Sequence, residues 1–113
     1  MRTMLRDKLS PLDDPILRRF RAALDELYGE RLERVVLFGS RARGEAGPES
    51  DYDVAVFLRE MPDRWEELER LADLRMRFLD GTGAFFEAKP YLTSAYRDRS
   101  PLIHEIRRER LDL

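Results

Sequence analysis

Residue types that usually carry redox, zinc or nucleophilic chemistry are almost missing from this chain. Its 113 residues include no cysteine and one histidine, His104. Without cysteine there is no disulfide framework, no thiolate zinc site and no cysteine nucleophile. A lone histidine makes neither a zinc site nor a catalytic triad, so we expect His104 to be a surface residue or a contact to a partner.

The chain also lacks long apolar runs and an excess of positive charge. Residues 1–9 contain no apolar stretch long enough for a signal peptide, and no later segment approaches a membrane span. We therefore expect a cytoplasmic protein that does not contact a membrane. The formal net charge is −2, whereas bulk attraction to nucleic acid needs a strong basic excess. Strong direct binding of nucleic acid is not expected.

The length suffices for one compact domain and is too short for two. Residues 1–12 are interpreted as a charged N-terminal leader and residues 13–113 as the domain. Charged residues make up 39% of the chain, well above the average. This high charged fraction indicates a modest core with a heavily charged surface.

Apolar residues at helical spacing predict three helices, over roughly residues 13–28, 63–80 and 100–109. Asp13 or Asp14 caps the first helix before a proline, and glycines end the first two. The predicted core-facing residues of the second helix are Trp65, Leu68, Leu71, Ala72, Met76 and Leu79. Phe85 and Phe86, which follow that helix, are also assigned to the core.

Three apolar runs predict strands at 34–38, 51–58 and 84–91. Pro90 indicates that the third strand lies at a sheet edge or finishes there. A short helix is expected from Ser40 to Gly44. The resulting order favours an α+β fold, in which a three-stranded mixed sheet is flanked by helices.

The turn at Gly39-Ser40 is a candidate phosphate site. A strand that ends at Gly39, with Ser40 opening a helix, presents free N–H groups and a hydroxyl at a helix N-terminus, which suits phosphate oxygens. A Walker A loop is excluded, because Glu45 and Ala46 stand where that motif requires Lys and Ser or Thr. Since strand-to-helix turns often use glycine and serine, a purely structural turn stays open.

Asp51 and Asp53 are the candidate metal ligands. Alternate residues of a strand point to the same side, and their Cα atoms are roughly 6–7 Å apart. Two carboxylates at that spacing repel each other unless a divalent cation lies between them, and Mg²⁺ is commonly held by such a pair together with phosphates. A solvated Asp-x-Asp is the alternative, but the pair follows the phosphate-type turn closely, which favours a site.

Glu87 is the candidate third carboxylate, because a site that holds two metal ions usually takes a further carboxylate from another strand. It stands among apolar residues of the third predicted strand, where an acidic residue is otherwise unexpected. The alternative is a surface residue on an edge strand, paired with Lys89 on the same face.

The central residues resemble the signature of the DNA polymerase β-like nucleotidyltransferase superfamily. The matching positions are Gly39-Ser40-Arg41-x-Arg43-Gly44 and Ser50-Asp51-x-Asp53. At this length the chain is similar to the minimal nucleotidyltransferase (MNT) branch from its first helix onward. The resemblance implies the nucleotidyltransferase fold and, as in MntA-type antitoxins of HEPN–MNT systems, transfer of AMP from ATP to a tyrosine hydroxyl of a HEPN ribonuclease toxin.

Carried over by position, the resemblance assigns Gly39 and Ser40 to the nucleotide phosphates, and Asp51 and Asp53 to two Mg²⁺ ions. Glu87 would complete the metal site near the incoming hydroxyl, where family members often have aspartate.

Arg41 and Arg43 fall inside the motif and could neutralise phosphate charge through their planar fork of donors. Alternatively, they are solvated residues of the short helix. The run at residues 107–110 is interpreted as a solvated helix face with local ion pairs.

Two other functions stay open at this stage. The protein could be a binding antitoxin with little catalysis, which forms a hetero-oligomer with its toxin. A small-molecule transferase of the aminoglycoside type is disfavoured, because one compact domain leaves little room for a separate acceptor module.

Overall fold

Helices and strands follow the predicted order, with one strand added after the last helix. The computed structural model describes residues 13–45, 47 and 50–113, so the leader assigned to residues 1–12 lies outside the described residues. The helices are α2 (Pro15–Tyr28), α3 (Ser40–Arg43), α4 (Arg64–Thr82) and α5 (Pro101–Glu109), and the 3₁₀ helices are η2 (Gly29–Arg31) and η3 (Thr93–Arg97). The strands are β1 (Leu32–Phe38), β2 (Tyr52–Leu58), β3 (Phe86–Leu92) and β4 (Leu111–Asp112).

The strands form a mixed sheet of order β3-β2-β1-β4. β1 runs antiparallel to β2 and β4, whereas β2 and β3 are parallel. The described sheet therefore has four strands and not three, because the sequence gives no strand signal for the two residues of β4. Pro90 lies in the edge strand β3, which confirms the edge position expected from it.

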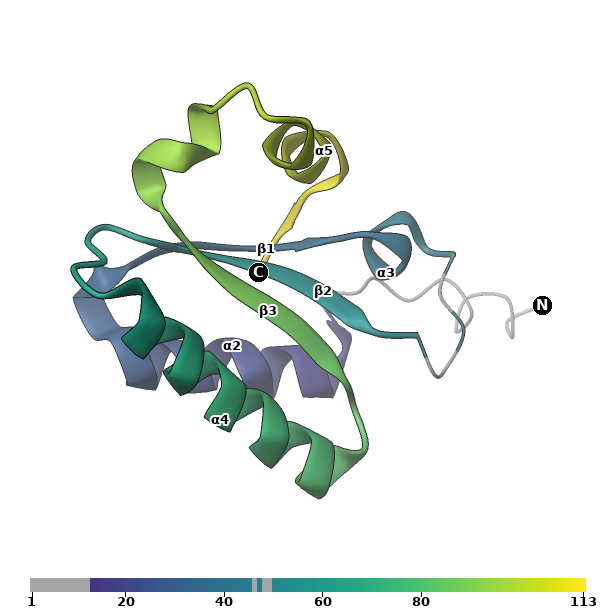
Figure 1. Ribbon diagram of the computed structural model, residues 1–113. Coiled ribbons are helices and arrows are strands. Elements are labelled where there is room, and N and C mark those ends of the chain that lie inside the picture. Colours follow the sequence, from purple (N-terminus) through teal and green to yellow (C-terminus); the bar gives the residue numbers. More distant parts are fainter. Residues whose placement is uncertain (1–12, 46, 48–49) are drawn as a thin grey trace.

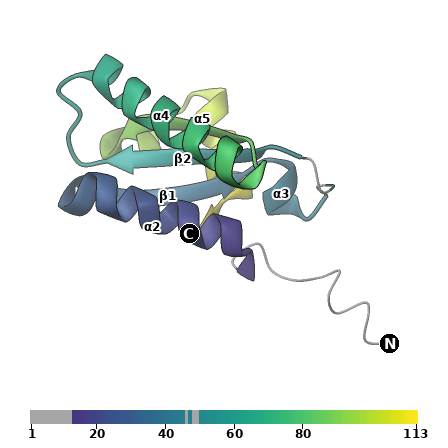
Figure 2. The same cartoon turned by 90° about the horizontal axis from the view of Figure 1, so that it is seen from below.

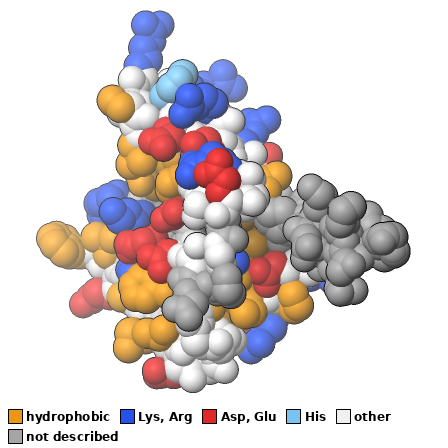
Figure 3. All heavy atoms as spheres, turned by 90° about the vertical axis from the view of Figure 1, so that its right-hand side faces the viewer, with side chains coloured by type: hydrophobic (Ala, Val, Ile, Leu, Met, Phe, Trp, Pro, Cys, Tyr) orange, Lys and Arg blue, Asp and Glu red, His pale blue; other side chains and the backbone are white. Residues whose placement is uncertain are grey.

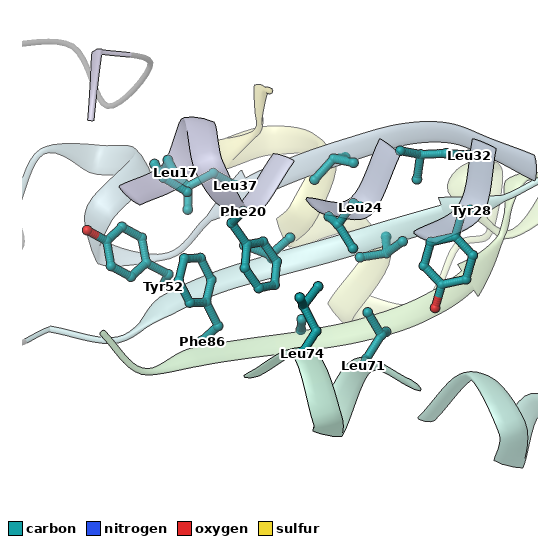
Figure 4. Packing of buried hydrophobic residues seen from close by; sticks show 14 of the residues in the cluster. Leu17, Phe20, Leu24, Tyr28, Leu32, Leu37, Tyr52, Leu71, Leu74 and Phe86 are labelled. Atoms are coloured by element: carbon teal, nitrogen blue, oxygen red, sulfur yellow. The ribbon is translucent and has the colours of Figure 1, made fainter. Parts of the chain in front are cut away.

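Helices cover both faces of the sheet. α2 and α4 lie side by side on one face, and α5 lies on the other (Figures 1 and 2). The larger core is between the sheet and the first two helices, where Phe20, Tyr52 and Phe86 stack (Figure 4). The smaller core joins α5 to the sheet through Val36, Ala55, Phe57, Ile103 and Ile106.

Capping side chains define the helix starts. Asp14 accepts a hydrogen bond from Ile16 N–H at 2.8 Å, which confirms the predicted cap before Pro15. Asp63 caps α4 and Ser100 caps α5 in the same way. The left-handed Gly83 ends α4, whereas Gly81, which we expected outside the helix, lies within it.

The face that α4 buries differs from the prediction. Trp65 is 77% exposed and Met76 is 55% exposed, so their assignment to the core is wrong. Leu71 is buried as predicted, whereas Ala72 is exposed and the other two buried residues, Glu67 and Leu74, were not predicted. The spacing of apolar residues predicted the wrong face because Glu67, a charged residue, is buried in the first turns of α4. Arg31 of η2 pairs with this carboxylate at 2.6 Å.

The two adjacent phenylalanines after α4 have different environments. Phe86 is 1% exposed in the stack, as predicted, but Phe85 is 44% exposed and its assignment to the core is wrong. Successive strand residues point to opposite faces, so only one of the two can enter the same core. In the described part of the chain, no helix is both long enough and apolar enough to span a membrane.

Candidate active site

The turn between β1 and α3 has the geometry expected of a phosphate-binding turn. Gly39 has a φ of 79° and caps α3, which begins at Ser40. N–H groups at the start of a helix lack an intrahelical acceptor, and the helix dipole favours negative charge there. The strand–turn–helix arrangement is confirmed, and what the turn binds stays a prediction.

Gly39 also leaves space for Asp53. A Cβ atom at position 39 would lie 2.4 Å from Asp53 Oδ2 and 3.2 Å from Asp53 Cγ. Any side chain at this position would therefore have to displace the carboxylate. A positive φ and a close approach both require glycine here, so the carboxylate lies directly against the turn.

The sheet brings Asp53 and Glu87 together. They are register partners on the parallel strands β2 and β3, and Asp51 is exposed just before β2. The strand begins at Tyr52, one residue after the predicted start, so Asp51 precedes the strand. Asp53 and Glu87 line a cavity of ≈ 190 Å³. Its other lining residues are Phe38, Val54, Lys89, Tyr91 and Leu102.

Negative charge accumulates at Asp53. Burial is the main cause that raises the pKa of its carboxyl, and the charges of Asp51, Glu87 and Glu109 raise the pKa further. Arg43 acts in the opposite direction. Seen from the side on which α3 lies, acidic and basic side chains stand next to each other (Figure 3). A cation bound here would relieve the repulsion among these carboxylates.

Glu87 has a cationic partner that differs from the one considered from sequence. Arg75 Nη2 lies 3.1 Å from Glu87 Oε1, and Arg75 Nε donates to the Phe86 carbonyl at 2.6 Å. The sequence alternative paired Glu87 with Lys89 of the same strand. Because Arg75 reaches β3 from α4, only the packing of the helix against the sheet reveals the pair.

Arg41 contacts Ser50 and Tyr52, the two residues that flank Asp51. Its guanidinium carbon is 3.9 Å from the centroid of the Tyr52 ring, and its Nε donates to the Ser50 carbonyl at 2.9 Å. The Tyr52 hydroxyl donates to Asp14 Oδ2 at 2.6 Å, and burial with this bond raises the pKa of Tyr52 to about 12. Arg41 therefore joins α3 to Ser50 and β2, and Tyr52 extends the connection to the cap of α2.

Arg43 and Glu109 meet at the turn. Glu109 Oε1 accepts from Gly39 N–H at 3.2 Å, and Glu109 Oε2 accepts from Arg43 Nη1 at 2.8 Å. The Glu109 side chain is 10% exposed, so the prediction of a solvated face at 107–110 is wrong at this residue. Sequence reasoning missed Glu109 because the contact joins residues 70 positions apart.

The carboxylates suit a hard divalent cation in their chemistry. Mg²⁺ is usually held by one or two carboxylates together with substrate phosphates, and the charge at Asp53 favours a cation. Within residues 13–45, 47 and 50–113, no group of three or more acidic, cysteine or histidine side chains is placed to hold a metal ion. The charge at Asp53 therefore fits a cation that phosphates help to hold, and a three-carboxylate site at Asp51, Asp53 and Glu87 stays a prediction.

A family match covers most of the chain. Residues 17–106 match the nucleotidyltransferase domain family. The chain belongs to this family. A curated relative from Methanocaldococcus jannaschii, named "Putative protein adenylyltransferase MJ0141", is 35% identical over 63 residues. That match covers 56% of this chain and 63% of the relative, so the chain spans less than two thirds of the relative's length.

Solved structures share the fold. A toxin–antitoxin complex crystallised with AMP-PNP has a TM-score of 0.56 at 19% identity, over 83% of this chain and 69% of that chain. A mutant of the toxin–antitoxin complex MntA-HpeT has a TM-score of 0.54 at 20% identity, over 85% and 70%. These matches confirm the predicted nucleotidyltransferase fold.

Proposed function

We propose that this protein is a metal-dependent nucleotidyltransferase that transfers AMP from ATP to a tyrosine hydroxyl of a HEPN ribonuclease toxin and thereby neutralises the toxin. The observation that carries the proposal is the Asp53 carboxylate lying against the Gly39 turn. Family membership supports nucleotidyl transfer. The name of the archaeal relative supports a protein acceptor, and the similar complexes support a toxin partner and ATP.

The proposed reaction is an in-line displacement. The acceptor's hydroxyl oxygen forms a bond to the α-phosphorus while the bond to the pyrophosphate oxygen breaks, and the hydroxyl proton passes to a site carboxylate or to water. Gly39 and Ser40 bind the phosphates, and Arg43 offsets their charge. These residues act mainly by positioning the reactants.

Asp51 and Asp53 would hold two Mg²⁺ ions, and Glu87 would join them after leaving Arg75. When bound, the cations stabilise the negative charge that develops on the phosphates. Asp53 is suited to bind a cation beside the phosphates, because it lies between the turn and Glu87. The protein would act as a hetero-oligomer with its toxin.

An antitoxin that works by binding alone is the alternative. One observation favours it, namely that Glu109 and Arg75 already engage the turn and Glu87. Transfer to a small molecule such as an aminoglycoside is the less favoured third function.

The decisive experiment is intact-mass measurement of the protein encoded by the neighbouring gene, after incubation with this protein, ATP and Mg²⁺. We expect mass gains in AMP units that vanish for Asp51→Asn/Asp53→Asn and persist for Asp73→Asn. Asp73 is an exposed residue of α4, so it serves as the matched control. An unmodified toxin in a stable complex with this protein would favour binding alone.

A further inference from the structure

The C-terminal strand fixes Glu109 opposite the phosphate-type turn. β4 pairs with β1 so that Val36 faces Asp112 and Leu37 faces Leu111. Only Arg110 separates β4 from Glu109, the last residue of α5. This short connection keeps Glu109 near the end of β1, where Gly39 N–H donates to Glu109 Oε1 at 3.2 Å.

Two of the donors that surround the turn are thus directed at one carboxylate. Gly39 supplies a backbone N–H, and Arg43 supplies a guanidinium that lies 2.8 Å from Glu109 Oε2. Arg108 Nη2 is a more distant neighbour at 3.9 Å. A backbone N–H together with an arginine is also the donor set that binds phosphate oxygens.

We propose that Glu109 is a built-in competitor of the nucleotide, whose carboxylate occupies Gly39 N–H and Arg43 until a triphosphate displaces it. The inference rests on the proposed function, since it assumes that the turn binds nucleotide phosphates. It adds a residue outside the motif that sets the affinity for nucleotide.

Charge and geometry both require that the Glu109 carboxylate leaves the turn when a phosphate binds there. A carboxylate and a phosphate oxygen cannot both take the single Gly39 N–H in good geometry, and two like charges at this distance repel each other. Glu109 is the last residue of α5, so its side chain can rotate away without unwinding the helix. Arg43 also pairs with Glu45 at 2.8 Å, which keeps the guanidinium near the turn after Glu109 leaves.

Nucleotide affinity measures the competition directly. Calorimetric titration with AMP-PNP and Mg²⁺ would compare the wild type with Glu109→Gln, Glu109→Ala and the control Glu105→Gln. Glu105 is exposed one turn earlier on α5, so its substitution removes the same charge without the contact. We expect Kd to fall roughly three- to tenfold for both Glu109 variants, as for the loss of a partly exposed charged contact, and to stay unchanged for Glu105→Gln.

Each outcome decides the inference. The inference is supported if the Glu109 variants bind AMP-PNP more tightly than the wild type and Glu105→Gln, or if only the Glu109 variants bind it. Equal binding by all four proteins overturns the inference while nucleotide binding stands. Weaker AMP-PNP binding by the Glu109 variants would make Glu109 part of the nucleotide site and would overturn the inference. An equal gain in affinity for Glu105→Gln would be an effect of net charge and would overturn it too. If no protein binds AMP-PNP, the inference and the proposed function fail together.

Discussion

At the residue scale, the site depends on how closely a carboxylate approaches a backbone turn. Asp53 lies against Gly39, and its strand neighbour Glu87 is held by Arg75. Positive φ alone occurs at several glycines of the described chain, including Gly83 at 77°. Only at Gly39 would an added Cβ atom also meet a side chain, since nothing lies within 4 Å of the corresponding atom at the other glycines described.

Gly39→Ala should therefore lower the transfer rate by more than its loss of stability can explain. Gly83 is left-handed, so Gly83→Ala should cost roughly 1–2 kcal/mol of unfolding free energy. Gly39, with φ 79° and ψ −160°, has a conformation that is almost exclusive to glycine, so Gly39→Ala should cost roughly 1–3 kcal/mol. Only Gly39→Ala pushes Asp53 away, so we expect its transfer rate to fall at least about 100-fold, as for a misplaced catalytic group. Chemical unfolding and toxin modification would be measured for both variants. Equal activities in the two variants would contradict the role given to the contact.

Asp53→Asn should stabilise the protein while it removes transfer activity. Burial and neighbouring carboxylates raise the pKa of Asp53 in the folded state. A carboxyl group with a raised folded pKa destabilises the fold when ionised, and this effect fades as the pH falls through that pKa. In EDTA the variant should melt at a higher temperature than the wild type at neutral pH, and the difference should shrink towards about pH 3.

Melting curves followed by circular dichroism across that pH range test this expectation. The exposed Asp73→Asn serves as the control and should match the wild type throughout. A lower melting temperature for Asp53→Asn at neutral pH would show that the carboxylate stabilises the fold without a cation.

At the element scale, aromatic stacking joins the edge strand to the first helix. The Phe86 ring of β3 lies 3.8 Å from the Phe20 ring of α2 and 4.5 Å from the Tyr52 ring of β2, centroid to centroid. Tyr52 and Phe86 are register partners, and they immediately precede the pair Asp53 and Glu87 on the same two strands. The same packing that forms the core therefore positions the carboxylates.

Phe86→Ala and Phe85→Ala form a matched pair with opposite expectations. Phe86→Ala opens a cavity in the stack and should cost about 3–5 kcal/mol of unfolding free energy. The half-exposed Phe85 lies outside this stack, so Phe85→Ala should cost less than about 1 kcal/mol. Urea unfolding of both variants measures the difference, and similar losses would mean that the two rings share the core.

Most elements could be predicted from the sequence because their signals are local. Asp14 before Pro15 and the Gly39 break each act within a few residues, and the structure confirms both. β4 could not be predicted, because two residues are too few for a strand pattern and their partners in β1 are far away along the chain. The buried face of α4 was also missed, since Glu67 enters the core only through its pairing with Arg31.

At the scale of the whole molecule, the site combines contacts of very different range. The turn and Asp53 belong to one local motif, so the sequence could identify both. Arg75 and Glu109 reach the same place from α4 and from the end of α5. Their positions depend on how helices pack on the two faces of the sheet, which no local pattern encodes.

Because the site spans the sheet and both helix layers, ligand binding should stabilise the entire fold. A ligand that binds only the folded state adds about 2.7 kcal/mol at a concentration 100 times its Kd. For a domain near this size the melting temperature then rises by roughly 10 °C. We expect this shift with AMP-PNP and Mg²⁺, and we expect EDTA to remove most of it, because the carboxylates alone repel the triphosphate.

Asp51→Asn/Asp53→Asn should lose the magnesium dependence even if some nucleotide still binds through the turn. A full shift in EDTA would mean that the Gly39 turn and Arg43 hold the nucleotide without a cation, and it would contradict the role given to the metal in nucleotide binding.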